Sequence, residues 1–371
     1  PIIPTRSSPT STEQQVERAP RGVRSAAVFL QADLPTHRTA MTQITPTVDF
    51  DQDGKQVGWL KVPHSVTRSA YGVLPVPIAV IRNGDGPKLM LSAGNHGDEY
   101  EGQVVLTRMI QNLEARDITG TLLILPALNL PAALGTTRVS PLDAGNLNRA
   151  FPGDPNGGPT WKIADYVENS LMPRVDVVAD FHGGGASLDY RPHASTHYGP
   201  DASEDHKKKS LDLVTKLGVP HVMIFERQNK TEGLPDGAIR QGVISIGGEY
   251  GGMGSVSRAG VQLVQTAVDR LLAGLGIKGE LPENLPEPQI LRIGGDAHVY
   301  APEPGVFEPA TELGDSVRAG DLCGHVWFPE NPSREPVSVP FNGDGDVVCK
   351  RHPGRVEAGD CVAHLASPWQ A

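Results

Sequence analysis

The chain of 371 residues carries a formal net charge of -10, and 20% of its residues are charged. A chain of this length suggests two or three domains with a large core. The acidic balance argues against a general nucleic-acid binder, because no basic stripe is available to neutralise phosphates. Gly (42 residues) and Pro (33) make up about a fifth of the chain, against roughly 12% in average usage, and their irregular spacing indicates many loops.

Cysteine usage and hydropathy indicate the compartment. The three cysteines, Cys323, Cys349 and Cys361, all lie near the C-terminus. An odd number at these spacings suits neither a disulfide framework nor a cysteine-based zinc site, so we expect a reducing compartment. No apolar run approaches the ~20 residues of a membrane span, and the apolar run 26–30 is too short for a signal-peptide core. We therefore predict a cytoplasmic protein without membrane association.

Residues 1–40 are rich in Pro, Ser, Thr and Arg and show no sustained periodicity. This composition predicts a loosely ordered N-terminal extension. Met41 precedes the first orderly segment, which makes it an alternative start of the native chain.

From residue 41 to 279 the pattern predicts an α/β domain in which strands and helices alternate. Strands are predicted over 57–62, 76–81, 88–93, 121–126, 175–180, 194–198, 221–225 and 243–249. Helices are predicted over 100–113, 160–171, 203–217 and 258–275. Several strands are continuous apolar runs, as in the buried interior of a mostly parallel sheet. Such a sheet carries its functional groups just beyond the carboxyl ends of its strands.

After residue 279 the composition changes. Residues 280–288 (ELPENLPEP) read as a linker, and residues 288–371 contain short β runs separated by Gly-Asp turns, which predict a small all-β domain. This domain resembles a biotinyl/lipoyl barrel, so a carrier or binding function is one alternative. Carriers need a lysine at an exposed hairpin tip, whereas Lys350, the only lysine after Gly279, lies in a strand-like run. We therefore interpret the domain as a cover or rim for an active site.

The segment 91–103 (LSAGNHGDEYEGQ) is the first motif whose residues could take part in catalysis or metal binding. A predicted strand ends there, and His96 and Glu99 follow, three residues apart. On a tight turn or first helical turn their side chains lie on the same side, where they can occupy two corners of a tetrahedral zinc site. The alternative is that Glu99 favours a helix N-terminus and that His96 is an ordinary loop residue.

Two further strand ends extend this hypothesis. His182, in the segment DFHGG, stands where a third metal ligand is expected, although a capping or structural histidine fits its position equally well. Glu249, in the segment GGEYGG, is placed to act as a general base toward metal-bound water, or else lies in a solvated turn. Two histidines and one glutamate leave the fourth position of a zinc ion open, which is typical of a catalytic site.

Binding of a substrate carboxylate is predicted for the loop NLNRAFPG, where Asn148 and Arg149 offer an amide and a bidentate guanidinium. Arg138 could supply a second cation, and one arginine would stabilise the oxyanion. A surface salt bridge is the alternative for either arginine, and the stronger one for Arg138. His193 and His197 are not proposed as a metal site, because nothing nearby completes a ligand set.

The four motifs HGDE, NLNRAFPG, DFHGG and GGEYGG, in this order, resemble the succinylglutamate desuccinylase/aspartoacylase family of zinc amidohydrolases, relatives of the metallocarboxypeptidases. The resemblance covers roughly residues 76–275. It implies a metallocarboxypeptidase-like mixed, mostly parallel sheet with flanking helices, and a small-molecule substrate. It also implies a role for each matching residue: His96, Glu99 and His182 as ligands of one Zn²⁺ per chain, Glu249 as general base, and Arg138, Asn148 and Arg149 in substrate binding. Phe181 replaces the family's usual Leu, a change that should not disturb ligation.

Within this family, the chain from Met41 is similar to the deacetylases that convert Nα-acetyl-L-2,4-diaminobutyrate to acetate and 2,4-diaminobutyrate in ectoine degradation. The implied substrate has an α-carboxylate for Arg149 and an ammonium group for a carboxylate that the sequence does not identify. Another Nα-acyl amino acid, such as an acetyl or succinyl derivative of an acidic residue, or a peptide carboxyl end, stays open as the substrate. Succinyl or aspartyl side chains would need additional cations, and Arg191, Arg227 and Arg240 fall in plausible loops. Ester cleavage and a homo-oligomer are also left open.

Overall fold

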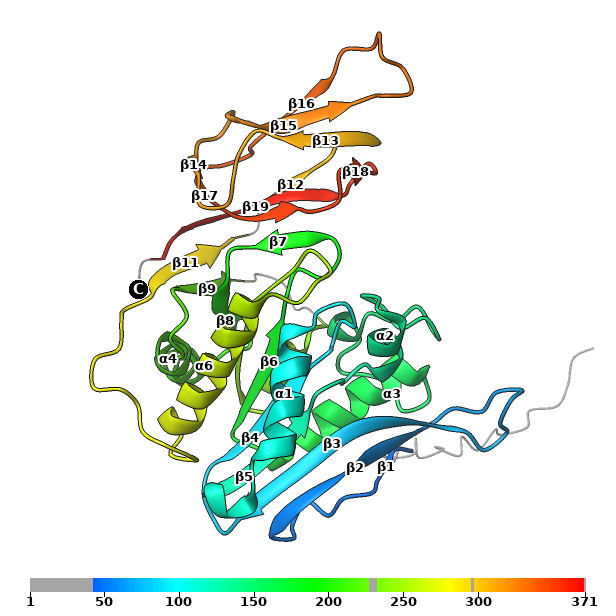
Figure 1. The fold of residues 1–371 in the computed structure, drawn as a ribbon, viewed down its shortest axis with the longest axis vertical. Coiled ribbons are helices and arrows are strands. Elements are labelled where there is room, and N and C mark those ends of the chain that lie inside the picture. The colour runs from blue at the N-terminus through cyan, green and yellow to red at the C-terminus, as the bar shows by residue number, and fades with distance from the viewer. Residues whose placement is uncertain (1–42, 227–231, 295–296, 370–371) are drawn as a thin grey trace, which may run out of the picture. The chain divides into compact units, whose positions relative to one another are not determined.

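The computed structural model describes residues 43–226, 232–294 and 297–369. The predicted extension, residues 1–40, lies outside this range. The described residues form a mixed α/β structure with a large mixed sheet, followed by a C-terminal region of strands (Figure 1). No helix within these ranges is both long and apolar enough to cross a membrane.

The elements follow in chain order. The chain up to residue 198 contains β1 (Thr45–Pro46), β2 (Gly54–Pro63), β3 (Val73–Asn83), β4 (Lys88–Ala93), α1 (Glu101–Asn112), β5 (Gly120–Leu125), α2 (Leu130–Gly135), α3 (Pro159–Tyr166), β6 (Val177–His182), β7 (Leu188–Tyr190) and β8 (His193–Tyr198). It continues with α4 (Glu204–Thr215), β9 (His221–Glu226), α5 (Leu234–Arg240), β10 (Ile244–Glu249) and α6 (Arg258–Gly274). The C-terminal strands are β11 (Gln289–Ile293), β12 (His298–Tyr300), β13 (Gly305–Pro309), β14 (Ser316–Val317), β15 (Leu322–Trp327), β16 (Val337–Pro340), β17 (Gly345–Arg351), β18 (Arg355–Val356) and β19 (Cys361–Pro368).

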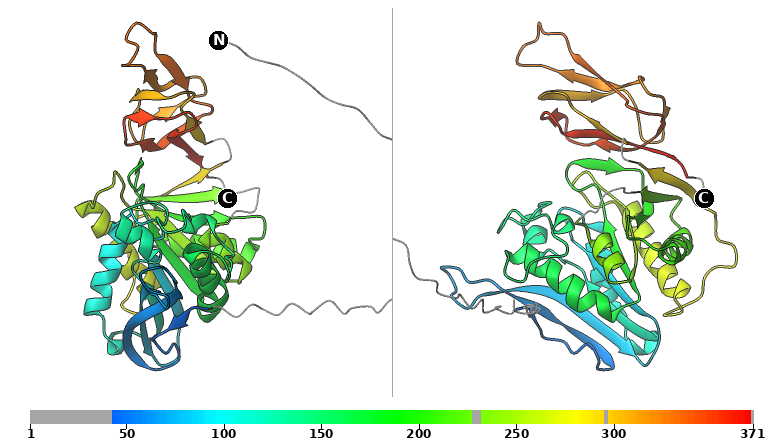
Figure 2. Two further views of the ribbon diagram at one scale, coloured as in Figure 1. Left: turned by 90° about the vertical axis from the view of Figure 1, so that its right-hand side faces the viewer. Right: turned by 180° about the vertical axis from the view of Figure 1, so that it is seen from behind.

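One sheet runs through most of these strands, in the order β1-β2-β3-β5-β4-β6-β10-β8-β9-β11-β19-β17-β14. Its centre, β5-β4-β6-β10, is parallel, whereas β2 and β3 are antiparallel and β8 runs antiparallel to β10. A second sheet has the order β16-β15-β13-β18. Figure 2 shows how β11 continues the large sheet toward the C-terminal strands. Because this sheet is continuous, the predicted boundary between residues 41–279 and 288–371 stays a prediction.

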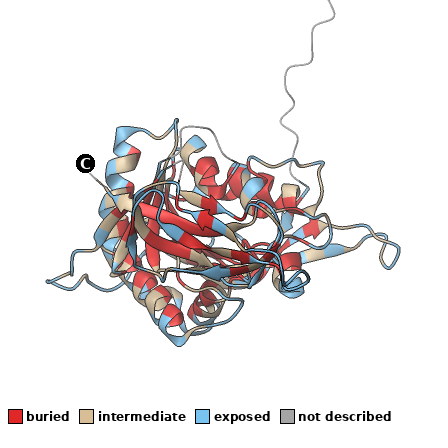
Figure 3. Ribbon diagram, turned by 90° about the horizontal axis from the view of Figure 1, so that it is seen from above, coloured by how far each residue is buried: buried red, intermediate tan, exposed pale blue. Residues whose placement is uncertain are grey.

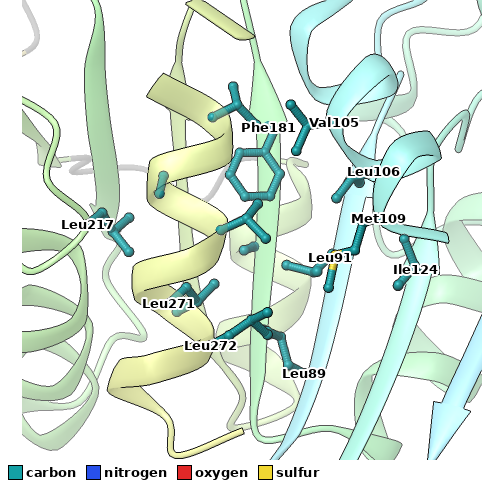
Figure 4. Packing of buried hydrophobic residues seen from close by; sticks show 14 of the residues in the cluster. Leu89, Leu91, Val105, Leu106, Met109, Ile124, Phe181, Leu217, Leu271 and Leu272 are labelled. Atoms are coloured by element: carbon teal, nitrogen blue, oxygen red, sulfur yellow. The ribbon is translucent and has the colours of Figure 1, made fainter. Parts of the chain in front are cut away.

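Helices cover both faces of the large sheet. On one face, α1 packs on β4, β5 and β6 and against α6, and α4 packs on β8 and β10. Figure 4 shows Val105, Leu106 and Met109 of α1 on the same side as Leu271 and Leu272 of α6. The spacing of these α1 residues places them on one helical stripe, which explains why the segment folds as a buried-face helix. The other face is covered by α3 and α5. The buried residues accordingly concentrate on the strands and on the helix faces turned toward them (Figure 3).

Every strand and helix predicted between residues 57 and 275 has a counterpart, although several bounds differ. The strand predicted over 175–180 lies at Val177–His182, so that His182 is its last residue. The helix predicted over 160–171 is an α-helix only to Tyr166 and continues as a π-helical segment, Val167–Leu171. The sequence pattern did not predict α2, α5 or β7, which are too short to show a periodicity of their own.

Candidate active site

The site lies at the carboxyl ends of three neighbouring parallel strands. β6 lies between β4 and β10, and the register pairs Ala93 with Phe181 and Glu249 with His182. The turn after β4 leads directly into α1 and carries His96 and Glu99. Ligand candidates from the turn after β4 and from the end of β6 therefore meet the predicted base at the carboxyl ends of these strands, as parallel topology requires.

His96, Glu99 and His182 form one compact group. The Nδ1 atom of His96 lies 2.7 Å from Glu99 Oε1, and the Nδ1 atom of His182 lies 2.8 Å from Glu99 Oε2. His96 and Glu99 are buried, and the His182 side chain is 14% exposed. Within the described ranges, this is the one group of at least three His, Cys, Asp or Glu side chains able to hold a metal ion, with donor atoms within 4.8 Å of one another. His193 and His197 belong to no such group.

The outer nitrogen of each histidine is held by an oxygen acceptor. His182 Nε2 lies 2.7 Å from Asp180 Oδ2, and His96 Nε2 lies 3.2 Å from Asn146 Oδ1. Asp180 is fixed in turn, because Ser92 Oγ and Asn95 Nδ2 donate to its two carboxylate oxygens at 2.7 and 2.9 Å. Histidines that bind zinc are oriented in this way, with the second ring nitrogen bound by an oxygen. The donor set therefore fits a zinc ion.

The charges around the group favour a cation. Burial alone would raise the pKa of Glu99, but His96 and His182 outweigh it and hold that pKa well below its usual value. Burial would lower the pKa of His182, yet Asp180 and Glu99 hold it well above its usual value. Two buried carboxylates thus stabilise positive charge in the space between them.

Asp180→Asn should weaken zinc binding by about 10- to 100-fold, because loss of the carboxylate that orients a metal-binding histidine has this effect elsewhere. Competition with a chromophoric chelator measures the zinc dissociation constant. Asp176→Asn is the matched control: Asp176 lies at the opposite end of β6, where its carboxylate accepts a hydrogen bond from Lys88 N. Unchanged zinc affinity in Asp180→Asn would rule out the orienting role.

Glu249 lies beside the histidine pair at the end of β10. Its Oε2 atom is buried and has no hydrogen-bond partner among the described residues. Burial raises the pKa of Glu249 well above its usual value, and the negative charge of Glu99 adds to this effect. A carboxylate in such a position accepts a proton more readily than an exposed glutamate does.

The predicted substrate-binding residues line the same cavity, which has a volume of about 1160 Å³. Arg138 Nη1 lies 3.4 Å from Glu99 Oε1 and 3.3 Å from His96 Nδ1, with the side chain 42% exposed. Asn148 Oδ1 accepts a hydrogen bond from Leu234 N at the start of α5, and the backbone oxygen of Asn148 accepts one from Arg149. All the predicted site residues except Glu99 thus line this cavity, and Glu99 is buried in contact with His96 and His182, which do line it.

The additional cations considered for an acidic acyl group are placed differently. Arg240 binds Glu168 through two hydrogen bonds of 2.8 and 2.7 Å. Arg227 lies outside the described residues, and Arg191 is not part of the cavity lining. Arg292 and Lys207, which the sequence did not suggest, do line the cavity.

Three polar residues near the site were missed from the sequence. Asp180 could have been found, because it lies two residues before His182 and strand periodicity puts both on one face. Asn146 stands in the NLNR motif, but only the structure shows its contact with His96. Tyr190 lines the cavity from β7, and its hydroxyl oxygen lies 3.4 Å from Nδ1 of His364 on β19. No local pattern signals that contact, because β7 pairs with β17 of the C-terminal region.

Comparison with known proteins identifies close relatives. Residues 85–275 match the model of the succinylglutamate desuccinylase/aspartoacylase catalytic domain. The chain is 39% identical over 330 residues to the N-alpha-acetyl-L-2,4-diaminobutyric acid deacetylase of Halomonas elongata, covering 87% of this chain and 94% of that protein. The product-bound structure of the ectoine utilization protein EutE (DoeB) from Ruegeria pomeroyi matches with a TM-score of 0.83 and 36% identity, covering 88% of this chain and 99% of the other. A succinylglutamate desuccinylase/aspartoacylase structure from Rhodobacter sphaeroides matches with a TM-score of 0.83 and 32% identity, covering 89% and 100%.

Proposed function

The chain belongs to the succinylglutamate desuccinylase/aspartoacylase family, and from this premise we propose that it removes the acetyl group from Nα-acetyl-L-2,4-diaminobutyrate. The products are acetate and L-2,4-diaminobutyrate, so the protein is an N-acyl amino acid hydrolase of ectoine degradation. The observation that carries this proposal is the group of His96, Glu99 and His182 beside Glu249, whose Oε2 atom is buried without a hydrogen-bond partner among the described residues, in a chain similar to a deacetylase over most of its length.

One Zn²⁺ per chain is the cofactor of this proposal, held by His96, Glu99 and His182. The ion supplies Lewis acidity, which polarises the amide carbonyl and acidifies water. Asp180 and Asn146 keep the two imidazole rings in place from behind. Arg138, close to Glu99 and His96, is positioned to stabilise negative charge that develops on the carbonyl oxygen.

Glu249 moves the proton in this mechanism. It takes a proton from the attacking water on its buried carboxylate and delivers it to the departing amine. Its high pKa, caused chiefly by burial, lets the carboxylate hold the proton between the two steps. Asn148 and Arg149 bind the α-carboxylate of the substrate, the guanidinium by paired hydrogen bonds.

The proposal extends to the type of fold and to the cellular compartment. The central sheet is metallocarboxypeptidase-like, and the C-terminal strands are biotinyl/lipoyl-barrel-like. The latter supply His298, Asp344 and His364 to the cavity wall, which supports their role as a rim of the site. The enzyme acts on a small molecule in the cytoplasm.

A panel of N-acyl amino acids tests the substrate. Zinc-loaded enzyme should release acetate from Nα-acetyl-L-2,4-diaminobutyrate, and a chelator should abolish the release. Nγ-acetyl-diaminobutyrate, N-acetylaspartate and succinylglutamate serve as comparison substrates. Turnover of an acidic acyl-amino acid alone would keep the hydrolytic mechanism and discard the ectoine assignment. In that case Arg292 and Lys207, which line the cavity, would be the candidates for binding the acidic group of the substrate.

A further inference from the structure

Gly251, two residues after Glu249, contacts the chain segments that carry His182 and Glu99. Its carbonyl oxygen accepts a hydrogen bond of 2.8 Å from Gly184 N, in the loop after β6. On its other side it lies against the carboxylate of Glu101, so closely that a β-carbon at position 251 would stand 2.2 Å from Glu101 Oε1. Only a residue without a side chain leaves room for this approach.

Glu101 is a buried carboxylate that the proposed mechanism does not use. It lies in the first turn of α1, is 2% exposed, and accepts a hydrogen bond of 2.9 Å from Ser257 N, the residue before α6. Burying a carboxylate is costly unless it gains compensating hydrogen bonds or favourable dipoles. Here the start of α6 supplies both, because exposed N–H groups and the helix dipole favour negative charge at that end.

The residues that make these contacts share one spacing. Glu101 follows Glu99 by two residues, Gly184 follows His182 by two, and Gly251 follows Glu249 by two. Gly251 therefore ties the segment of Glu249 to that of His182, through Gly184, and to that of Glu99, through Glu101. Glu101 and Gly251 lie outside the cavity lining and act through these neighbours.

We propose that Glu101 and Gly251 form a positioning link that sets the spacing between the metal-binding Glu99 and the base Glu249. The assignment of these two roles rests on the proposed function, whereas the contact itself does not. A misplacement of about 1 Å between reacting groups can lower a rate about 100-fold, so a link of this kind governs kcat more than substrate affinity.

Gly251→Ala tests the link, because the added methyl group must displace the Glu101 carboxylate. We expect kcat to fall by about 100-fold, with KM and bound zinc close to the unsubstituted protein. Gly324→Ala is the matched control: its β-carbon would meet Glu308 O at 2.4 Å in the C-terminal strands, away from the site. This control should lower the melting temperature and leave kcat unchanged. A normal kcat in Gly251→Ala would overturn the proposal.

A second change separates positioning from general damage. In Gly251→Ala/Glu101→Ala the carboxylate is gone and the methyl group has room, so kcat should exceed that of Gly251→Ala by at least about 10-fold. Glu101→Gln, which keeps an oxygen acceptor for Ser257 N, should retain more kcat than Glu101→Ala. Multiplicative losses in the double variant would overturn the link.

The melting temperatures of the same four proteins test the contact without any substrate. The unsubstituted protein, the two alanine variants and their combination should show non-additive changes, because the two residues touch. If the unsubstituted enzyme hydrolyses no compound of the substrate panel, the proposed function is wrong. The link is then judged by the non-additivity of the melting-temperature changes alone. Additive changes in melting temperature would overturn the link even in a fully active enzyme.

Discussion

Glu249→Gln will retain one zinc ion per chain and lose about 1,000-fold in kcat, within the range that general acid–base catalysis contributes. The amide has nearly the shape of the carboxylate but cannot take a proton from water at neutral pH. The thermal stability of the Glu249→Gln protein should be preserved or increased. The change removes a carboxylate whose Oε2 atom is buried without a partner and whose negative charge is repelled by that of Glu99. Steady-state kinetics, metal analysis and thermal melting measure the three quantities.

Glu312→Gln, an exposed glutamate of the C-terminal region, is the control for this substitution and should behave like the unsubstituted enzyme. If Glu249→Gln kept normal turnover, Glu249 would not be the base. If it lost zinc together with activity, its main contribution would be to the metal site.

His182→Ala is expected to lose both zinc and activity, and His96→Ala should do the same. Removal of His182 also leaves Asp180 and Glu99 facing each other without the imidazole between them. Breaking a buried ion pair in this way costs about 3 kcal/mol, so the melting temperature should fall even in the absence of metal. Metal analysis after dialysis and a thermal melt with excess chelator separate the two losses.

His352→Ala, an exposed histidine far along the chain from these ligands, is the corresponding control. Full zinc occupancy in His182→Ala would remove this residue from the ligand set. Zinc loss without any change in the chelator-treated melt would mean that the two carboxylates tolerate each other once His182 is gone.

The grouping of the predicted site residues could be expected from the sequence because these residues lie at or near strand ends. His96 lies three residues after β4, whereas His182 and Glu249 are the last residues of β6 and β10, and neighbouring parallel strands bring such positions together. Phe181 precedes His182 on β6, but the alternation of side chains along a strand turns it to the opposite face. It is buried in the core, where its ring lies 5.7 Å from that of Tyr250.

Contacts between distant segments could not be predicted in this way. Tyr190 reaches the cavity because β7 pairs with β17, and Asn148 holds the start of α5 through Leu234 N. Both depend on how separate segments dock, and a three-residue strand or a seven-residue helix carries too little periodicity to indicate its partner. The continuous path from β9 through β11 to β19 was missed for the same reason.

Because β7 pairs with β17 and β11 with β19, one wall of the cavity depends on strands that are synthesised after the proposed ligands. Domains generally fold as they emerge, N-terminal parts first. The proposed ligands His96, Glu99 and His182 and the proposed base Glu249 all precede residue 250, whereas Tyr190 gains its strand partner only with β17 and its contact with His364 only with β19. A nascent chain can therefore bring His96, Glu99 and His182 together while one wall of the cavity is still missing. That wall is complete only after β19 has been synthesised.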